Sequence, residues 1–380
     1  MPYITVLVEP KSYQISFDDI LNGIDQSVLN RENTFDTRTD FRNETPQKLL
    51  DNTDFTDMLK TLTDFTKVHR NLIDTEDKTT LYEHFSIPKR SGGLRPIDAP
   101  KEELMRALRD LKYIFERKFY ASYHTCAFAY AKGRCPVQAV KRHQANKSRW
   151  FLKLDFHNFF GSTTEEFLYN QIITIFPFNE IIKFQTGKTA LKEVISLCML
   201  NGGLPQGTPM SPTLTNLMMI PVDHAISKAM RNRTPHLVYT RYADDIILSS
   251  DLSFKFKDVE QEILDILNQF KAPFSLNTAK TRYGSSAGRN WNLGVMLNKD
   301  NDITIGYQKK KRFKAMLFSL HNDYKANKKW SLEDMRVLAG LMSYYRSVEK
   351  ERIDEIIQSY DTKFGISTEK IIKEALSAAI

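Results

Sequence analysis

Two adjacent carboxylates stand between two apolar runs, and this arrangement constrains the fold more than any other feature of the chain. The runs from His236 to Tyr242 and from Ile246 to Leu248 have the composition of strands. Asp244 and Asp245 lie between them, in a connection short enough for a tight turn. The sequence therefore predicts a hairpin with two carboxylates at its tip. Because an Asp-Asp pair between strands is most often only a turn, a function for it depends on other segments.

A third carboxylate ends another predicted strand, Trp150 to Asp155. If this strand lies beside the hairpin, the three carboxylates can hold two magnesium ions about 3.5–4 Å apart. Magnesium prefers oxygen ligands and keeps substrate phosphates in its shell, so two or three carboxylates are sufficient. Taken alone, Asp155 is equally compatible with a helix cap.

Several further segments lie in a definite order around these carboxylates. Leu204-Pro205-Gln206-Gly207, followed by Ser211-Pro212, stands between Asp155 and the Tyr242-Ala243-Asp244-Asp245 hairpin. The other segments are Ser91-Gly92-Gly93-Leu94-Arg95-Pro96, Ala127 to Arg134, Asn277 to Thr281, and Asn292-Leu293-Gly294-Val295. Their order and spacing resemble those of bacterial reverse transcriptases, from about Lys89 to Leu297. A single Tyr-x-Asp-Asp is a weak signal, whereas the ordered set is highly specific.

This resemblance implies an α+β fold of the right-hand polymerase type. Its parts are fingers, a palm in which an antiparallel sheet packs on helices, and a helical thumb. The expected division is an N-terminal extension over 1–80, fingers and palm over 81–305, and the thumb over 306–380. The extension carries 9 Lys or Arg and 15 Asp or Glu, which gives it a net charge of −6. Because the whole chain has a net charge of +8, the residues after the extension carry +14. A basic body suggests a polyanionic partner.

Periodic apolar residues predict the principal helices. We expect helices over Lys101 to Tyr120, after Thr164, over Ser211 to Met230 and over Val259 to Phe270. Short helices are expected near Phe55 to Phe65, a hairpin across 298–301, and several helices from Lys309 to the end.

The resemblance also implies roles for individual residues. Asp155, Phe156, Asp244 and Asp245 are expected at the metal site, with Asp155 and Asp244 as principal ligands. Arg95 is expected on the incoming triphosphate, Gln206 on the nucleotide and template, and Phe160 against a ribose 2′-hydroxyl. Lys280 matches a lysine that protonates pyrophosphate. Lys309, Lys310, Lys311 and Arg312 open the expected thumb and are predicted to contact nucleic acid.

Each of these residues also has a purely structural interpretation. Phe160 can be core, Gln206 the middle of a turn, and Lys280 a solvated lysine. The basic cluster can be a solvated helix start. His143 and His157 are interpreted as structural or RNA-contacting rather than as general bases.

The expected reaction is the RNA-directed addition of dNTPs to a primer 3′ end, with two Mg²⁺ ions as cofactor and Mn²⁺ as a possible substitute. The expected partners are an RNA template, of the structured noncoding kind, dNTPs and the DNA product. A homo-oligomer or an accessory defence protein is also possible. We predict a reduced, cytoplasmic bacterial protein, because the three cysteines are odd in number and form no CxxC pair. No signal peptide is expected, because Met1 to Pro10 has no cationic region followed by a long apolar stretch. No membrane span is expected, because the chain has no run of about 18 apolar residues.

Three kinds of protein remain open. Retron enzymes typically show Asn-Ala-x-x-His and Val-Thr-Gly, whereas this chain has Val137 to His143 and Asn292-Leu293-Gly294 in those places. A compact core without a following RNase H, integrase or endonuclease domain favours a stand-alone antiphage defence enzyme that acts with a noncoding RNA. The alternatives are a retron enzyme that makes RNA-linked single-stranded DNA and a catalytically idle RNA-binding scaffold. Phe160 argues against an RNA-templated RNA polymerase.

Overall fold

The computed structural model describes residues 3–8, 11–16, 55–88, 92–119, 122–286 and 294–377. Lys89, Ser91 and Trp291 to Leu293 lie outside these ranges, so the expectations that rest on them are not addressed. The chain forms two compact units. The larger unit comprises Met1–Cys135 and Phe151–Tyr283, and the smaller, C-terminal unit comprises Pro136–Trp150 and Gly284–Ile380. The functional division at residues 80 and 305 stays a prediction.

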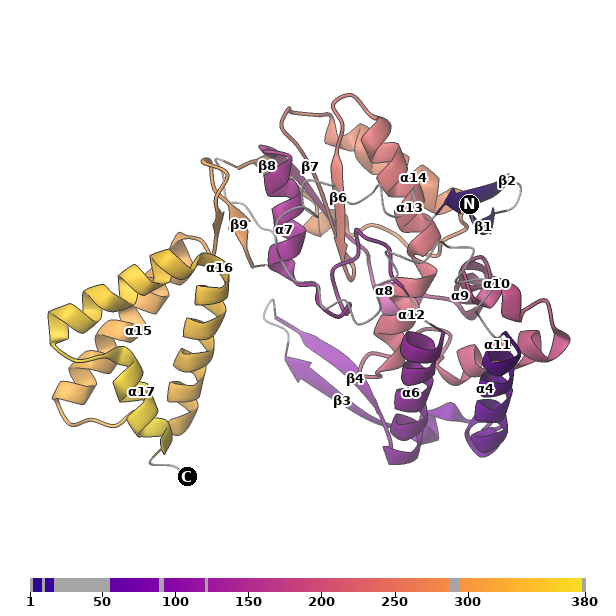
Figure 1. Cartoon of the computed structure of the whole chain (residues 1–380), viewed down its shortest axis with the longest axis horizontal. Coiled ribbons are helices and arrows are strands. Elements are labelled where there is room, and N and C mark those ends of the chain that lie inside the picture. The colour runs from indigo at the N-terminus through magenta and orange to yellow at the C-terminus, as the bar shows by residue number, and fades with distance from the viewer. Residues whose placement is uncertain are drawn as a thin grey trace. The chain divides into compact units, whose positions relative to one another are not determined.

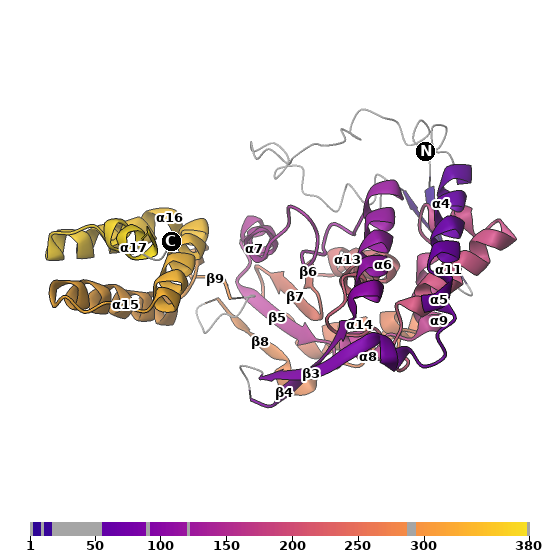
Figure 2. The ribbon, with the colours of Figure 1, turned by 90° about the horizontal axis from the view of Figure 1, so that it is seen from below.

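Four strands form one sheet, in the order β6-β7-β5-β8 (Figure 2). Its strands are β5 (Trp150–Asp155), β6 (Val238–Tyr242), β7 (Asp245–Ser250) and β8 (Arg282–Ser285). The predicted hairpin is confirmed, because β6 and β7 pair antiparallel and Tyr242 faces Asp245 across a two-residue turn. β7 is buried from Ile246 to Ser250, which explains its almost continuous apolar run.

Helices pack on this sheet to form one large core. Glu102–Tyr113 (α6) is followed by a π-helical turn, Ile114–Lys118 (η2). The others in this unit are α8 (Phe159–Ser162), α9 (Glu165–Ile172), α10 (Phe178–Ile181), α11 (Gln185–Leu197), α12 (Met210–Met218), α13 (Ile220–Asn232), α14 (Phe256–Gln269) and the turn η3 (Thr278–Lys280). The helix after Thr164 is confirmed, and the Thr164 side chain accepts from the Phe167 N–H as its cap.

The single helix predicted over Ser211 to Met230 is wrong in one respect. The structure has two helices, α12 and α13, which meet at Met219. Pro221 explains the break, since it has no N–H to donate to the preceding turn and is favoured at the start of a new helix. The junction lets α13 run alongside β6 (Figure 1).

The N-terminal part of the larger unit contributes a second hairpin and a helix. β3 (Tyr82–Pro88) and β4 (Leu94–Pro100) pair antiparallel. The short helix predicted near Phe55 is confirmed as α4 (Phe55–Val68), whose buried face belongs to the large core. The remaining elements are β1 (Tyr3–Val8), β2 (Lys11–Ser16), α5 (Arg70–Ile73) and η1 (Lys78–Leu81).

The C-terminal unit is mainly helical and has its own core. It contains α7 (Pro136–Ala145), β9 (Met296–Leu297), β10 (Ile303–Thr304), α15 (Tyr307–Lys325), α16 (Leu332–Phe364) and α17 (Thr368–Ser377). The last three helices pack on one another around Phe313, Leu317 and Leu338. α7 belongs here through a reciprocal pair of hydrogen bonds between the Gln144 and Asn301 side chains and backbone. None of the helices in the described ranges is both long and apolar enough to cross a bilayer.

Candidate active site

The end of β5 and the β6–β7 turn bring the three predicted carboxylates to one edge of the sheet. The Phe156 N–H donates to the Asp244 carbonyl at 3.1 Å, which ties the turn to the residue after Asp155. On the other side, the Asn277 N–H donates to the Asp155 carbonyl at 2.7 Å. The turn residue Ala243 has a φ of 58°, in the left-handed region that tight hairpin turns require. The spatial neighbourhood inferred from the sequence is therefore present.

Two lysines neutralise part of the charge of this site. The Lys280 ammonium lies 2.9 Å from both oxygens of Asp155, and the Lys153 ammonium lies 2.6 Å from Asp245. Among the described residues, no cationic side chain lies within 4.0 Å of the Asp244 carboxylate. Three acids thus share two close counter-charges.

Burial and mutual repulsion act on the two turn carboxylates in the same direction. Burial raises the pKa of Asp244, and the neighbouring charges of Asp245 and Asp155 raise it further. Burial also raises the pKa of Asp245, although the hydrogen bond from Lys153 opposes it. The hydrogen bond to Asp155 raises the pKa of Lys280, which keeps this lysine charged. A site with this excess of partly buried negative charge favours a bound cation.

The donor set fits a hard divalent cation such as Mg²⁺, because it consists of carboxylate oxygens. The oxygens of the three acids do not all lie within 4.8 Å of one another; in the described parts of the chain, that holds for His124, Cys126 and Asp223. The latter group does not fit a cation, because the Arg241 guanidinium already contacts both Asp223 oxygens. Asp155 and Asp245 instead each contact a lysine, Lys280 and Lys153, whereas Asp244 contacts neither of them.

The segment around Gln206 is fixed against the β3–β4 hairpin that carries Arg95. The Asp98 N–H donates to the Gln206 carbonyl at 2.8 Å. Gly207 has a φ of +122°, and a Cβ on it would lie 2.9 Å from the Asp98 carbonyl oxygen, so only glycine fits. The Gln206 side chain is half-buried and that of Arg95 is exposed. Both are therefore accessible to a ligand, as the prediction for them requires.

Phe160 and Phe159 have different surroundings. Phe159 is 3% exposed; its ring stacks on Phe156 and packs at a tilt against Phe274, at ring-centroid distances of 5.2 and 4.9 Å. Phe160 is only partly buried, and its ring meets that of Tyr130 edge-on at 6.5 Å. Phe156 itself is buried, so its side chain is part of the core. Phe160 is the ring of this pair that can reach a ligand.

The backbone after Phe160 is held by the segment that precedes Gln206. The Leu204 N–H donates to the Phe160 carbonyl at 2.9 Å. A Cβ on Gly203 would lie 2.4 Å from the Gly161 carbonyl oxygen, a contact that no side chain could avoid. The position of Phe160 therefore depends on these glycines as well as on β5.

Sequence reasoning missed Lys153, Tyr130 and the buried pair of Arg241 with Asp223. A signal for Lys153 existed, because residues two apart on a strand share a face and Lys153 precedes Asp155 by two. A signal for Arg241 also existed, since a charged residue inside an apolar strand needs a buried partner. Tyr130 gave no such signal; its φ of 57° and half-exposed ring emerge only in the fold.

The predicted basic cluster lies in the C-terminal unit, at the start of α15. Lys309 donates to the Gly294 carbonyl, and Lys310 lies 2.5 Å from Glu349 of α16. Lys311 and Arg312 are exposed. The sequence run therefore contains two lysines with partners within the protein and two side chains open to solvent.

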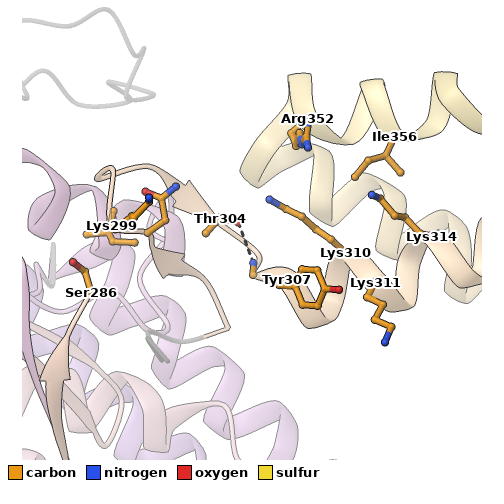
Figure 3. Close-up of a pocket in the computed structure, with 12 residues that line it drawn as sticks. Ser286, Lys299, Thr304, Tyr307, Lys310, Lys311, Lys314, Arg352 and Ile356 are labelled. Carbon is orange, nitrogen blue, oxygen red and sulfur yellow. Dashed lines mark hydrogen bonds between the residues drawn. The ribbon is translucent and has the colours of Figure 1, made fainter. Parts of the chain in front are cut away.

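A cavity of about 600 Å³ borders this helix start within the C-terminal unit (Figure 3). Its cationic lining residues come from three elements: Lys299, Lys310, Lys311, Lys314 and Arg352. Lys310 and Lys314 extend from α15 towards Arg352 and Ile356 of α16 (Figure 3). None of the residues that line it is acidic. The cavity suits an anion, and it includes cations that the sequence run did not identify.

Comparison with known proteins places the site in a family. Residues 87–316 match the family model described as reverse transcriptase (RNA-dependent DNA polymerase). The Retron Ec83 reverse transcriptase of Escherichia coli is 28% identical over 78% of this chain and 90% of its own length. The Retron Ec73 reverse transcriptase of Escherichia coli is 23% identical over 73% of this chain and 86% of its own. Apo telomerase from Candida tropicalis has a TM-score of 0.45 and 15% identity, over 84% of this chain and 67% of its own.

The family match covers more than half of the chain and includes the β5 strand, the Gln206 segment, the β6–β7 hairpin and Lys280. It confirms the resemblance drawn from the ordered segments. The chain belongs to the reverse transcriptase family, the RNA-directed DNA polymerases.

Proposed function

We propose that this chain copies an RNA template into DNA at the edge of the sheet where Asp155 meets the Asp244–Asp245 turn. The observation that carries the proposal is this meeting of three acids, in a chain whose family match spans them. The proposed cofactor is a pair of Mg²⁺ ions, for which Mn²⁺ could substitute. When bound, they would lower the pKa of the primer 3′-hydroxyl and neutralise charge on the triphosphate and pyrophosphate.

Different side chains of the protein would then bind the cations, donate a proton and contact the nucleotide. Asp155, Asp244 and Asp245 would hold the cations, with the Phe156 backbone beside them. Bound cations would compete with the Lys280 ammonium for Asp155 and leave Lys280 available to donate a proton to departing pyrophosphate. Two further side chains would act on the nucleotide: Arg95 would pair its planar fork with phosphate oxygens, and Gln206 would contact nucleotide and template.

Primer extension on an RNA template with Mg²⁺ tests the metal site. Asp155→Asn and Asp244→Ala should reduce dNTP addition to background, because each removes a ligand. Asp110→Asn is the matched control, since Asp110 is exposed on α6. Extension at the wild-type rate by Asp244→Ala protein would refute the assignment.

The sugar preference tests the role of Phe160. The half-buried Phe160 ring would exclude a ribose 2′-hydroxyl, which would clash with the ring and be left as an unpaired buried polar group, at a cost of about 1–3 kcal/mol. Phe160→Ala should therefore accept rNTPs far better, with a smaller loss for dNTPs. Phe159→Ala is the control, because Phe159 packs in the core and its loss should lower stability without relaxing sugar choice. Equal use of both sugars by the wild type would remove the basis of this role.

The cavity of the C-terminal unit is the proposed nucleic-acid contact, together with Lys309 and Arg312 beside it. Backbone phosphates would bind Lys311, Lys314, Lys299 and Arg352. Lys311→Glu with Lys314→Glu should lower affinity for a primer–template and reduce the salt dependence, by a slope of about 0.9 per lost contact on B-form DNA. Lys328→Glu with Lys329→Glu is a charge-matched control, because both lysines are exposed in the same unit away from the cavity lining. Equal slopes in the two double variants would exclude the cavity.

The identity of the RNA separates two versions of the function. A stand-alone defence enzyme acting with a structured noncoding RNA is one, and its antiphage role is itself a proposal. The other is a retron enzyme that makes RNA-linked single-stranded DNA, which is favoured by similarity to retron reverse transcriptases over more than 70% of this chain. Sequencing the nucleic acid that copurifies with wild-type and Asp155→Asn protein distinguishes them. DNA joined to RNA in the wild type alone supports the retron version.

Phage plating tests the defence role. The native locus should lower plating, and Asp155→Asn should restore it. Protection that survives this substitution would favour the idle scaffold, in which RNA binding alone matters.

A further inference from the structure

A buried ion pair lies directly behind the Asp244–Asp245 turn. The side chains of Arg241 on β6 and Asp223 on α13 are both fully buried. The Arg241 Nε donates to Asp223 Oδ1 at 2.9 Å, and Nη2 donates to Oδ2 at 2.8 Å. The Tyr239 hydroxyl also donates to Asp223, at 2.7 Å. Asp223 thus receives donors on both oxygens, which a buried carboxylate requires.

The other hydrogen bonds of Arg241 connect it to two backbone segments, to one directly and to the other through the Asn216 side chain. Nη1 donates to the Ala243 carbonyl at 3.1 Å, inside the turn. Nη2 also donates to the Asn216 side-chain oxygen at 3.2 Å. The Asn216 amide in turn donates to the Ala129 carbonyl at 2.8 Å, next to Tyr130. One guanidinium therefore connects the catalytic turn with the segment that places Tyr130 against Phe160.

The turn is held from the opposite side as well. The Phe156 N–H donates to the carbonyl of Asp244, while Arg241 holds the carbonyl of the residue before it. Two consecutive carbonyls are thus fixed by β5 and by Arg241, and Ala243 between the strands keeps its left-handed φ of 58°. This arrangement sets the direction in which the Asp244 side chain leaves the backbone.

A buried ion pair often adds little stability to a fold, because removing both charges from water costs free energy and well-packed apolar residues often stabilise as well. Arginine offers something apolar residues cannot, which is a rigid planar fork with five donors. A lysine could keep the charge pair with Asp223 but could not also reach Ala243 and Asn216 with fixed geometry. The bond pattern therefore points to orientation of the turn rather than to stability alone.

We propose that Arg241, held in place by Asp223, is a positioning residue of the polymerase reaction: it fixes the Ala243 carbonyl and so aims Asp244 at the metal site. The inference rests on the proposed role of Asp244. Arg241 touches no reacting atom and acts through the turn.

The test compares three variants. Arg241→Lys keeps the charge. The double variant Arg241→Gln with Asp223→Asn removes both charges, so it leaves no unpaired buried charge and serves as the test if Arg241→Lys fails to fold. Tyr239→Phe is the control, because it removes a bond to Asp223 and leaves the bonds of Arg241 to the turn in place. For each protein we would measure Tm, amide hydrogen exchange over 242–246 without metal, and kcat for dNTP addition together with KM for the primer–template.

The expected result is faster exchange in the turn and a lower kcat in both Arg241 variants. The loss should be of the order of 10²-fold, the size expected for a misplacement of about 1 Å. KM for the primer–template should stay unchanged, and Tyr239→Phe should keep kcat even if its Tm falls. Wild-type kcat in a folded Arg241 variant, or unchanged exchange in the turn, would overturn the inference. A wild type that fails to extend any primer would instead refute the proposed function, and the exchange measurement would still stand.

Discussion

Two kinds of ion pair lie around the β6–β7 turn and differ in how far they are exposed to solvent. The pair of Arg241 with Asp223 has side chains that are 0% exposed on both sides. The pair of Lys280 with Asp155 is open, because the Lys280 side chain is 56% exposed while Asp155 is 5% exposed. Lys153 with Asp245 is intermediate, at 20% and 23%. The sealed pair lies behind the turn, whereas the open pairs include two of the three acids, Asp155 and Asp245.

This difference in exposure shows which carboxylates can exchange their cationic partner for another cation. A sealed pair cannot lose one partner without leaving a charge in the protein interior, so it serves as a fixed part of the fold. An open lysine can move into water and leave its carboxylate to another cation, at little cost. The turn thus has a rigid support on one side and replaceable counter-charges on the other. Four predictions test this contrast.

The largest effect should come from the open side, on activity alone. Asp244→Ala should abolish nucleotide addition and leave the metal-free protein at least as stable as the wild type, because it removes a half-buried carboxylate that neighbouring acids repel. Primer extension and thermal unfolding in chelator give the two measurements. A large fall in Tm would show that Asp244 holds the fold, and the contrast would fail.

On the sealed side, the largest effect should be on stability. Asp223→Ala leaves the Arg241 charge buried and unpaired, which should cost about 3–5 kcal/mol of unfolding free energy. Denaturant unfolding measures this cost. A loss below about 1 kcal/mol, the range of an exposed pair, would mean that Arg241 escapes to water.

The sequence indicated the three acids and Lys280 on the open side, but it did not indicate Lys153 or the sealed pair. The strands that end in Asp155 and at the Asp244–Asp245 turn could be predicted from their apolar runs, and the metal-binding role of these acids was inferred from the ordered set of segments and stays a prediction. Their approach depends on backbone pairing, such as Phe156 with Asp244, which follows from the sheet. The helix break at Met219 was missed, although Pro221 was visible as its cause.

Other features depended on contacts between distant segments. Arg241 and Asp223 are 18 residues apart and lie on different elements, so their pairing is a property of the packed fold. The cavity of the C-terminal unit collects cations from the β9–β10 hairpin, α15 and α16, and only the α15 members form a run in the sequence. Composition and spacing detect runs, whereas they do not detect clusters assembled by folding.

A smaller effect is expected when an open pair is broken. Lys280→Ala should cost less unfolding free energy than Asp223→Ala, because the Lys280 side chain is 56% exposed and a cation can take its place at the Asp155 carboxylate, which is 5% exposed. The rate of nucleotide addition should fall much more than the stability, and its pH dependence at alkaline pH should change if Lys280 is the proton donor. Single-turnover kinetics across pH measure this. Lys192→Ala, an exposed lysine on α11, is a suitable control. An unchanged pH profile in Lys280→Ala would leave Lys280 with a charge-balancing role only.

The smallest effect is a pH-dependent difference in stability between the wild type and Asp244→Asn without metal. Burial and the charges of Asp245 and Asp155 raise the pKa of Asp244 in the folded state above its unfolded value of about 3.9. A raised folded pKa means that the folded state binds the proton more tightly. The stability from this proton is complete below the unfolded pKa and is lost as pH rises through the folded pKa. Asparagine has no proton to lose, so Tm of Asp244→Asn relative to the wild type should rise over this window and then level off.

Mg²⁺ should narrow this difference in Tm at neutral pH, because it stabilises the wild-type carboxylate more than the amide. Asp223→Asn should show no such compensation by Mg²⁺, because its partner is the sealed Arg241. If Mg²⁺ narrowed both differences equally, the open and sealed sides of the turn would not be distinct.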